Sequence, residues 1–269
     1  MSKVLSLKER FFRDGRVADC PVYDLHGHMG PLGGGWLPRS DTAAMVAAMD
    51  RTGVRLLVFC DHSTLMTPDV GNAPNIEAVR RFPTRLRAYC GINPNYPADV
   101  ERDVAAFDEY PDVFVGFKLL ADYHQVPITD PRCRPAWKLA DERGLPVLLH
   151  TWGGSRFDGP DLVRQAATEY PNARILMGHS CHGEWDKAVA VVNEFRHVYF
   201  ELTAVLDDRG VLELFVREAG SEKILFGTDS PWFNHHHYIG AVLGADIDDA
   251  ARHNILHRNA ERILGLKGG

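Results

Sequence analysis

The residues best suited to chemistry near the start of the chain are Asp24, His26 and His28, in the run Asp24-Leu25-His26-Gly27-His28. They follow an apolar segment at residues 21–23 that predicts a β-strand. Side chains two residues apart on a strand point to the same face, so both imidazoles can bind one cation while a neighbouring carboxylate orients a ring nitrogen. Taken alone, this spacing also fits two hydrogen-bonded histidines near a strand end, and the rest of the chain must decide.

The elements that must position these residues are predicted from hydrophobic periodicity and capping residues. Strands are expected at residues 21–25, 54–60, 86–92, 112–120, 146–150, 173–178, 198–202 and 223–229. Helices are expected at residues 41–51, 75–81, 98–110, 131–143, 161–170, 184–195, 211–219, 248–256 and 259–264. Eight strands alternating with helices in a chain of 269 residues are typical of an α/β protein with a (β/α)8 TIM barrel. No G-x-G-x-x-G follows the first strand, as an open dinucleotide-binding sheet would require, and no linker divides the chain, so we expect one domain over residues 1–269.

Six side chains that can bind a metal or move a proton fall at the predicted carboxyl ends of these strands: His26, His28, Lys118, His150, His179 and Asp229. In such a barrel the carboxyl ends of the strands form one mouth, so these side chains converge there. Each histidine taken singly fits a hydrogen-bonded structural role. As a set, buried imidazoles need partners, and a shared cation satisfies several of them at once. The set therefore predicts a metal site.

The order of these motifs along the chain resembles that of the amidohydrolase superfamily, specifically the amidohydrolase-related branch that includes aminocarboxymuconate-semialdehyde decarboxylase-like proteins. The residues that carry the resemblance are Asp24 to His28, Gly116 to Lys118, Leu148 to Gly153, Met177 to His179, Leu225 to Pro231 and Asn259 to Gly265. The resemblance implies a distorted barrel with one or two divalent cations, most often zinc.

The resemblance also implies a role for each site residue. His26, His28 and His150 are expected to ligate the metal, and Asp229 to be both ligand and proton acceptor. In mononuclear relatives the histidine matching His179 lies beside the metal and acts on substrate or water, whereas in binuclear relatives it binds the second metal.

Lys118 stands where a lysine carboxylated on its nitrogen bridges the metals of binuclear relatives. An ordinary ammonium has no lone pair and cannot ligate, so Lys118 is expected to bind metal only when it is carboxylated. We expect the mononuclear form.

The predicted function is that of a metal-dependent hydrolase. A divalent cation lowers the pKa of bound water towards about 7, and the resulting hydroxide attacks an amide, lactone or ester of a small molecule. The alternative reaction is decarboxylation or hydration of a small unsaturated or aromatic acid. An alternative of another class is a metal-binding barrel without catalysis, but retention of both Asp229 and His179 favours the enzyme.

Composition restricts the partners. The net charge of −6 is mild, and no run of lysine or arginine could bind a row of phosphates, which argues against nucleic acid as a partner. Five cysteines form no C-x-x-C pair, so a reducing cytoplasm is expected. The polar N-terminus and the lack of a long apolar run predict neither a signal peptide nor a membrane span. A small-molecule substrate is the expected partner, and the sequence is compatible with a homo-oligomer.

Other residues are less informative, and none is assigned to substrate binding. His235, His236 and His237 are expected in a solvated loop, and His182 in a turn, while Cys181 lacks an identifiable base. Aromatic residues in the loops at the mouth either wall an apolar pocket or pack between loops: Trp36, Trp152, Trp232 and Phe233. Arg39 and Arg156 are expected at the surface.

Overall fold

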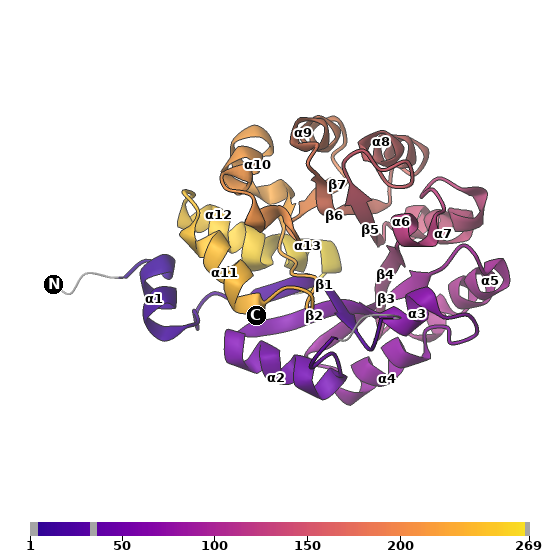
Figure 1. The fold of residues 1–269 in the computed structure, drawn as a ribbon, viewed down its shortest axis with the longest axis horizontal. Coiled ribbons are helices and arrows are strands. Elements are labelled where there is room, and N and C mark those ends of the chain that lie inside the picture. Colours follow the sequence, from indigo (N-terminus) through magenta and orange to yellow (C-terminus); the bar gives the residue numbers. More distant parts are fainter. Residues whose placement is uncertain (1–4, 33–36, 267–269) are drawn as a thin grey trace.

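The computed structural model describes residues 5–32 and 37–266, and its strands form one eight-stranded parallel sheet in chain order. The strands are β1 (Val22–Met29), β2 (Val54–Asp61), β3 (Leu86–Ile92), β4 (Phe114–Leu119), β5 (Pro146–Trp152), β6 (Arg174–His182), β7 (Val198–Glu201) and β8 (Ile224–Leu225). The strands lie inside a ring of helices (Figure 1). The predicted (β/α)8 barrel is confirmed.

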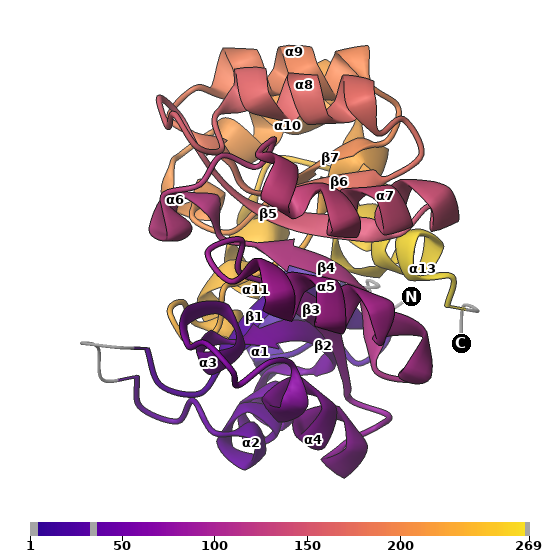
Figure 2. The same ribbon diagram turned by 90° about the vertical axis from the view of Figure 1, so that its right-hand side faces the viewer.

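Helices follow the strands and cover the outside of the barrel, with α8 and α9 on the opposite side from α2 and α4 (Figure 2). Their bounds are α1 (Leu7–Asp14), α2 (Thr42–Thr52), α3 (His62–Met66), α4 (Ala73–Arg81), α5 (Pro97–Ala105), α6 (Ala121–His124), α7 (Arg134–Arg143), α8 (Pro160–Glu169), α9 (Trp185–Glu194), α10 (Val211–Ala219), α11 (His235–Gly244), α12 (Asp249–His253) and α13 (Asn259–Leu264). A π-helical turn, Asn254–Arg258, joins α12 to α13. The helix predicted to begin at Asp41 begins at Thr42, because the Asp41 side chain accepts from Ala44 N and so caps α2. Gly53 ends α2 as expected, in the left-handed region with φ 82°.

Backbone hydrogen bonds close the barrel between its last and first strands. The eighth strand is shorter than the predicted segment 223–229, because only Ile224 and Leu225 pair regularly with β7. Beyond them the chain bonds to β1 instead: Leu25 N donates to Phe226 O over 3.0 Å, and His28 N donates to Ser230 O over 2.7 Å. The segment that carries Asp229 is therefore attached directly to the strand that carries the two histidines.

Side-chain alternation divides the core into two layers. On β5 and β6, Val147, Leu149 and Ile175 pack outward against the helices. Leu148 and Leu176 belong to a second cluster that fills the barrel interior. The side chains at the carboxyl ends of the strands lie above this interior layer, where a barrel carries its chemistry.

The structure corrects several predicted element bounds. The first strand was expected to end at Leu25, but β1 continues to Met29, and its pairing with β2 shifts between Asp24 and Gly27. Register shifts of this kind, like β-bulges, redirect side chains and are common beside active sites. Between the predicted strand 54–60 and the predicted helix 75–81, the structure has a further short helix, α3. Trp36, expected either to wall a pocket or to pack between loops, lies outside the described residues.

Candidate metal centre

The ring of His26 is held by a buried carboxylate from β7. Its Nδ1 lies 2.9 Å from Oε2 of Glu201, the last residue of β7. When Glu201 is ionised it only accepts hydrogen bonds, so Nδ1 then carries the proton and Nε2 carries the lone pair. Thr203 fixes the carboxylate in turn, donating to Oε1 from its backbone N over 2.9 Å and from Oγ1 over 2.6 Å.

The backbone at Gly227 lies close to the contact between His26 and Glu201. A Cβ at Gly227 would lie 2.0 Å from Glu201 Oε1 and 2.8 Å from His26 Cβ. Only glycine therefore fits at this position of the predicted eighth-strand segment.

The rings of His28 and His150 are held in the same way. His28 Nδ1 lies 2.8 Å from the backbone oxygen of Cys60, and a carbonyl can only accept, so Nδ1 again carries the proton. His150 Nδ1 lies 2.8 Å from Oδ2 of the buried Asp158. Three imidazoles thus carry their proton on Nδ1 and the lone pair on Nε2, which is the tautomer that metal ligation requires.

Asp229 faces two of these lone pairs. Its Oδ1 lies 3.1 Å from His28 Nε2 and 3.4 Å from His26 Nε2, yet among the residues described it has no aligned hydrogen-bond partner. Oxygen and nitrogen lone pairs this close repel one another unless a cation lies between them. Two ligand atoms each about 2.1 Å from one ion lie about 3.0–3.4 Å apart at octahedral or tetrahedral angles. The donor set fits a divalent cation.

His179 completes the cluster from β6. Its Nδ1 is buried and has no hydrogen-bond partner among the described residues, while its backbone N donates to Glu201 Oε2 over 3.2 Å. Its ring centroid lies 5.4 Å from that of His26 and 4.7 Å from that of His150. Ligand atoms of His26, His179 and Asp229 all lie within 4.8 Å of one another. A cation bound here therefore has His179 at ligand or near-ligand distance.

Lys118 reaches the same point from β4. It is fully buried, and its Nζ donates to Nε2 of His26 over 2.9 Å. Burial lowers the pKa of the Lys118 ammonium, although Asp229 and Glu201 oppose this effect. As an ammonium, Lys118 occupies the lone pair that a cation would take from His26, so metal binding requires its Nζ to move or to lose its proton.

The pKa values of the cluster match the needs of metal ligation. Burial lowers the pKa of His26 and of His179 well below the usual imidazole value, so both rings are neutral at pH 7. Burial raises the pKa of Asp229, but the approach of His26 and His28 outweighs burial and holds it well below the usual range. Burial raises the pKa of Glu201 to about 7, against the hydrogen bonds from Thr203.

A cavity of about 260 Å³ opens over this cluster. It reaches all six residues predicted from the strand ends, and its remaining lining is mostly apolar or aromatic: Leu32, His62, Leu120, Tyr123, Trp152, Ala204, Trp232 and Phe233. Three of the aromatic residues expected at the mouth therefore line the pocket. Among the described residues, Arg39 and Arg156 are not part of this lining, in agreement with their surface assignment.

The remaining histidine predictions are partly wrong. His235 was expected in a solvated loop, but it is buried in the first turn of α11, and its Nε2 lies 3.0 Å from Asp24 Oδ2. His236 and His237 are exposed in that helical turn. His182 is the last residue of β6 and stacks on Trp152.

Asp24 differs from its expected role, whereas Cys181 agrees with the expectation for it. Asp24 was expected to orient a histidine ring of its own strand. Its Oδ1 instead accepts from the backbone N of His26 over 3.0 Å and of Thr228 over 3.2 Å, and so ties β1 to the Asp229 segment. Burial raises the pKa of the Cys181 thiol to about 12, which agrees with its rejection as a nucleophile.

Sequence reasoning missed the residues that hold the ligands. Glu201 ends the apolar segment Val198–Glu201 in the same manner as His150 and His179 end theirs, and this strand-end position was the available signal. Asp158, His62 and Tyr123 lie in segments beyond the strands, where spacing carries no information on what they contact.

A parallel barrel with imidazoles, a lysine and a carboxylate gathered at the carboxyl ends of its strands has the architecture of a TIM-barrel enzyme. The sequence model of the family described as Amidohydrolase matches residues 72–266, and the chain belongs to the amidohydrolase family. The match includes the segments of Lys118, His150, His179 and Asp229, while β1 precedes it.

Solved structures share the fold at low sequence identity. An uncharacterised TIM-barrel protein from Bordetella bronchiseptica has a TM-score of 0.75 and 17% identity, with 91% of this chain and 99% of that chain covered. A 2,6-dihydroxybenzoate decarboxylase from Rhizobium has a TM-score of 0.74 and 16% identity, with coverage of 94% and 100%. A dihydroxybenzoic acid decarboxylase from Polaromonas sp. JS666, with bound manganese and the inhibitor 2-nitroresorcinol, has a TM-score of 0.72 and 17% identity, with coverage of 93% and 98%.

No curated protein sequence matches the chain. Within residues 5–32 and 37–266, no helix is both long enough and apolar enough to cross a membrane.

Proposed function

We propose that the chain is a divalent-metal-dependent enzyme with its site in one barrel domain, acting on a small molecule. The observation that supports this proposal most is the position of Asp229 Oδ1. It is buried without a hydrogen-bond partner among the described residues, 3.1 Å from His28 Nε2 and 3.4 Å from His26 Nε2. His26, His28, His150 and Asp229 are the proposed ligands. The expected zinc is one candidate and manganese, present in the Polaromonas relative, is the other.

The reaction that the site favours is decarboxylation of a small planar acid. The cavity has aromatic walls that suit a flat ring: Tyr123, Trp152, Trp232 and Phe233. Three structural relatives are named as decarboxylases of 2,6-dihydroxybenzoate, dihydroxybenzoic acid and 5-carboxyvanillate. When bound, the ion supplies a Lewis acid that holds an anionic oxygen of the substrate. The bond between ring and carboxylate breaks, carbon dioxide leaves, and the ring carbon takes one proton.

The chain's own residues supply that proton and the geometry. His179 is proposed to hold the proton, because it lines the cavity and its Nδ1 is buried without a hydrogen-bond partner among the described residues. Trp232 donates from Nε1 to His62 Nε2 over 3.2 Å, and His62 stacks on His28 at 4.6 Å between ring centroids. This stack joins the wall of the cavity to a proposed ligand.

Hydrolysis of an amide, lactone or ester is the second candidate. The observation that favours it is the ionised state of Asp229, whose pKa lies well below the usual carboxyl range. An ionised carboxylate can take a proton from water and later give it to a leaving group.

One assay separates the two reactions. Protein loaded with Mn²⁺ or Zn²⁺ is offered hydroxybenzoates, and carbon dioxide is measured, while amides, lactones and esters are offered in H₂¹⁸O and the product acid is analysed by mass. Release of carbon dioxide from the hydroxybenzoates supports decarboxylation, and ¹⁸O in the product acid of the second panel supports hydrolysis. Absence of turnover on both panels by metal-loaded protein favours the non-catalytic barrel.

Variants then test the assigned roles. Asp229→Asn and His179→Ala should each lower the rate by about 10²–10⁴-fold, the usual effect of losing a general acid or base. The exposed residues Asp112 and His237 provide matched controls, Asp112→Asn and His237→Ala, which should retain the wild-type rate. A wild-type rate for metal-loaded Asp229→Asn would remove Asp229 from the proton transfer.

A further inference from the structure

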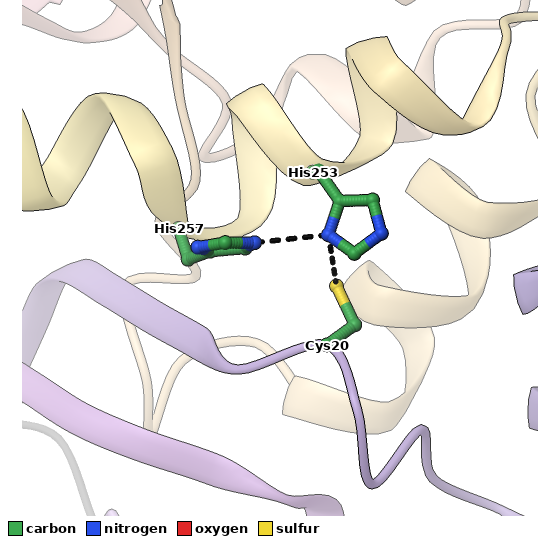
Figure 3. A group of neighbouring side chains, drawn as sticks. All are labelled: Cys20, His253 and His257. Carbon is green, nitrogen blue, oxygen red and sulfur yellow. Dashed lines mark hydrogen bonds between the residues drawn. The ribbon is translucent and has the colours of Figure 1, made fainter. Parts of the chain in front are cut away.

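A second cluster of metal-ligating side chains lies at the other end of the barrel. Cys20 lies two residues before β1, His253 ends α12, and His257 lies in the π-helical turn (Figure 3). His253 Nδ1 is 3.5 Å from Cys20 Sγ and 2.9 Å from His257 Nε2. Cys20 enters at the amino end of β1, whereas the cavity lies at the carboxyl end of the same strand, so the two clusters are separate.

A carboxylate fixes the tautomer of one imidazole in this cluster. Glu261, one helical turn further along, accepts a hydrogen bond from His257 Nδ1 over 3.1 Å. The lone pair of His257 Nε2 therefore faces His253 and Cys20. This is the carboxylate–histidine arrangement that orients metal-ligating imidazoles in proteins.

The spacing of the three ligand atoms fits one cation. Zinc lies about 2.3 Å from cysteine sulfur and about 2.0–2.1 Å from imidazole nitrogen, which places such ligand atoms about 2.9–3.6 Å apart. The observed separations of 3.5 and 2.9 Å fall in this range, and all three atoms lie within 4.8 Å of one another. π-Helical turns such as the one bearing His257 occur frequently at functional sites.

Without a cation the cluster is a chain of hydrogen bonds. His253 donates from Nδ1 to His257 Nε2, and the Cys20 thiol, buried and protonated, is left with the weak acceptor Pro21 O at 3.8 Å. A cation would replace the proton on His253 Nδ1 and the thiol proton, since ligands bind in their deprotonated forms.

We propose that Cys20, His253 and His257 form a second divalent-metal site, selective for thiophilic cations such as Zn²⁺, with Glu261 as its positioning residue. Cys20 belongs to the segment before β1, and the two histidines belong to the C-terminal helices. A bound ion therefore links the start of the barrel to its end. Its position away from the cavity gives it a structural role, distinct from that of the proposed catalytic metal.

Cobalt titration of the metal-free protein tests the proposal. A cysteine thiolate bound to Co²⁺ gives a near-ultraviolet charge-transfer band, which the imidazole and carboxylate ligands at the mouth cannot produce. The wild-type protein should develop this band with one equivalent of thiolate-bound cobalt. Glu261→Ala should weaken the cobalt affinity measured from the band by about 10–100-fold, the usual cost of losing such an orienting carboxylate.

Ligand variants assign the band to this cluster. Cys20→Ser and His253→Ala should each abolish the charge-transfer band. If one of the two variants fails to fold, the other still tests the assignment. Cys133→Ala, at a buried cysteine near Pro127 and outside the cluster, is the matched control and should keep the band. Absence of the band in folded wild-type protein at saturating Co²⁺ overturns the proposal, as does its persistence in folded Cys20→Ser.

Discussion

Glu201→Gln is the sharpest single test of how the proposed catalytic metal site is held. The substitution keeps the size and shape of a fully buried side chain and changes only its hydrogen-bonding atoms. Oε2 of Glu201 accepts hydrogen bonds from His26 Nδ1 over 2.9 Å and from His179 N over 3.2 Å. Oε1 accepts hydrogen bonds from the backbone N and the Oγ1 of Thr203. A glutamine offers one acceptor oxygen and one amide that can only donate. One of the two sides must therefore place a donor against a donor.

The size of the effect follows from which side loses its acceptor. If the oxygen stays with Thr203, the amide faces His26 Nδ1, and the imidazole fits only with its proton on Nε2. That tautomer has no lone pair for a cation at the mouth. Loss of such an orienting partner costs about 10–100-fold in metal affinity or activity, or about 1.4–2.7 kcal/mol.

Metal affinity is measured by competition with a chromophoric chelator at fixed pH, beside the unfolding midpoint of each metal-free protein. Glu218→Gln, at a partly exposed carboxylate paired with Arg217 on the surface, is the matched control and should bind metal as the wild type does. Wild-type affinity in folded Glu201→Gln would show that the His26–Glu201 contact does not set the ligand's tautomer.

Three further perturbations test the cluster and its surroundings. Gly227→Ala places a methyl group 2.0 Å from Glu201 Oε1 and should reduce metal affinity at least as much as Glu201→Gln does. Gly244→Ala, with open space around it, should keep the wild-type metal affinity, and equal metal affinities of the two variants would refute the packing argument. Burial lowers the pKa of His124 to about 4, below its unfolded value of about 6.5, so its stabilising contribution is full above pH 6.5 and is lost as the pH falls towards 4. Between pH 7 and about pH 4.5, His124 should lower the free energy of unfolding of the wild type, measured in urea, by about 2.5 kcal/mol. The free energy of unfolding of His124→Gln should fall by that much less over the same interval. Because burial holds the pKa of His26 well below that of a free imidazole, bound metal should be retained as the pH falls through about 6.5, and elemental analysis showing a release midpoint above that pH would contradict this.

The fold was predictable because each element carries its own local signal. Apolar runs such as Val54–Asp61 and the left-handed glycines that end α2 and α7 are properties of short stretches of sequence. The closure of the barrel was not predictable in detail. The segment after Leu225 looks like a strand because it is apolar, but its backbone pairs with β1 rather than β7, and pairing partners are a tertiary property.

The candidate ligands were predictable for a related reason. His26, His28, His150 and His179 all end apolar runs, and parallel strands bring those ends together. The groups that orient the ligands follow no such rule: His28 is held by the backbone oxygen of Cys60, and an oxygen of the main chain leaves no trace in the sequence. The cluster with Cys20 was missed because its parts lie at the two ends of the chain and one of them sits in a π-helical turn.

Backbone conformation at the mouth links these observations. His179 and Asp229 both lie in the left-handed region, with φ 65° and 54°, a conformation that costs a residue with a side chain about 1–3 kcal/mol unless its surroundings fix it. Both are fixed through their own N–H groups: His179 donates to Glu201 Oε2, and Asp229 donates to His26 O over 2.7 Å. Glu201 thus holds the His26 ring and the His179 backbone with one oxygen, and His26 holds the Asp229 backbone with another. The two residues proposed to move protons are therefore positioned by the same contacts that turn the His26 lone pair towards the metal, so a change at Glu201 should disturb ligation and proton transfer together.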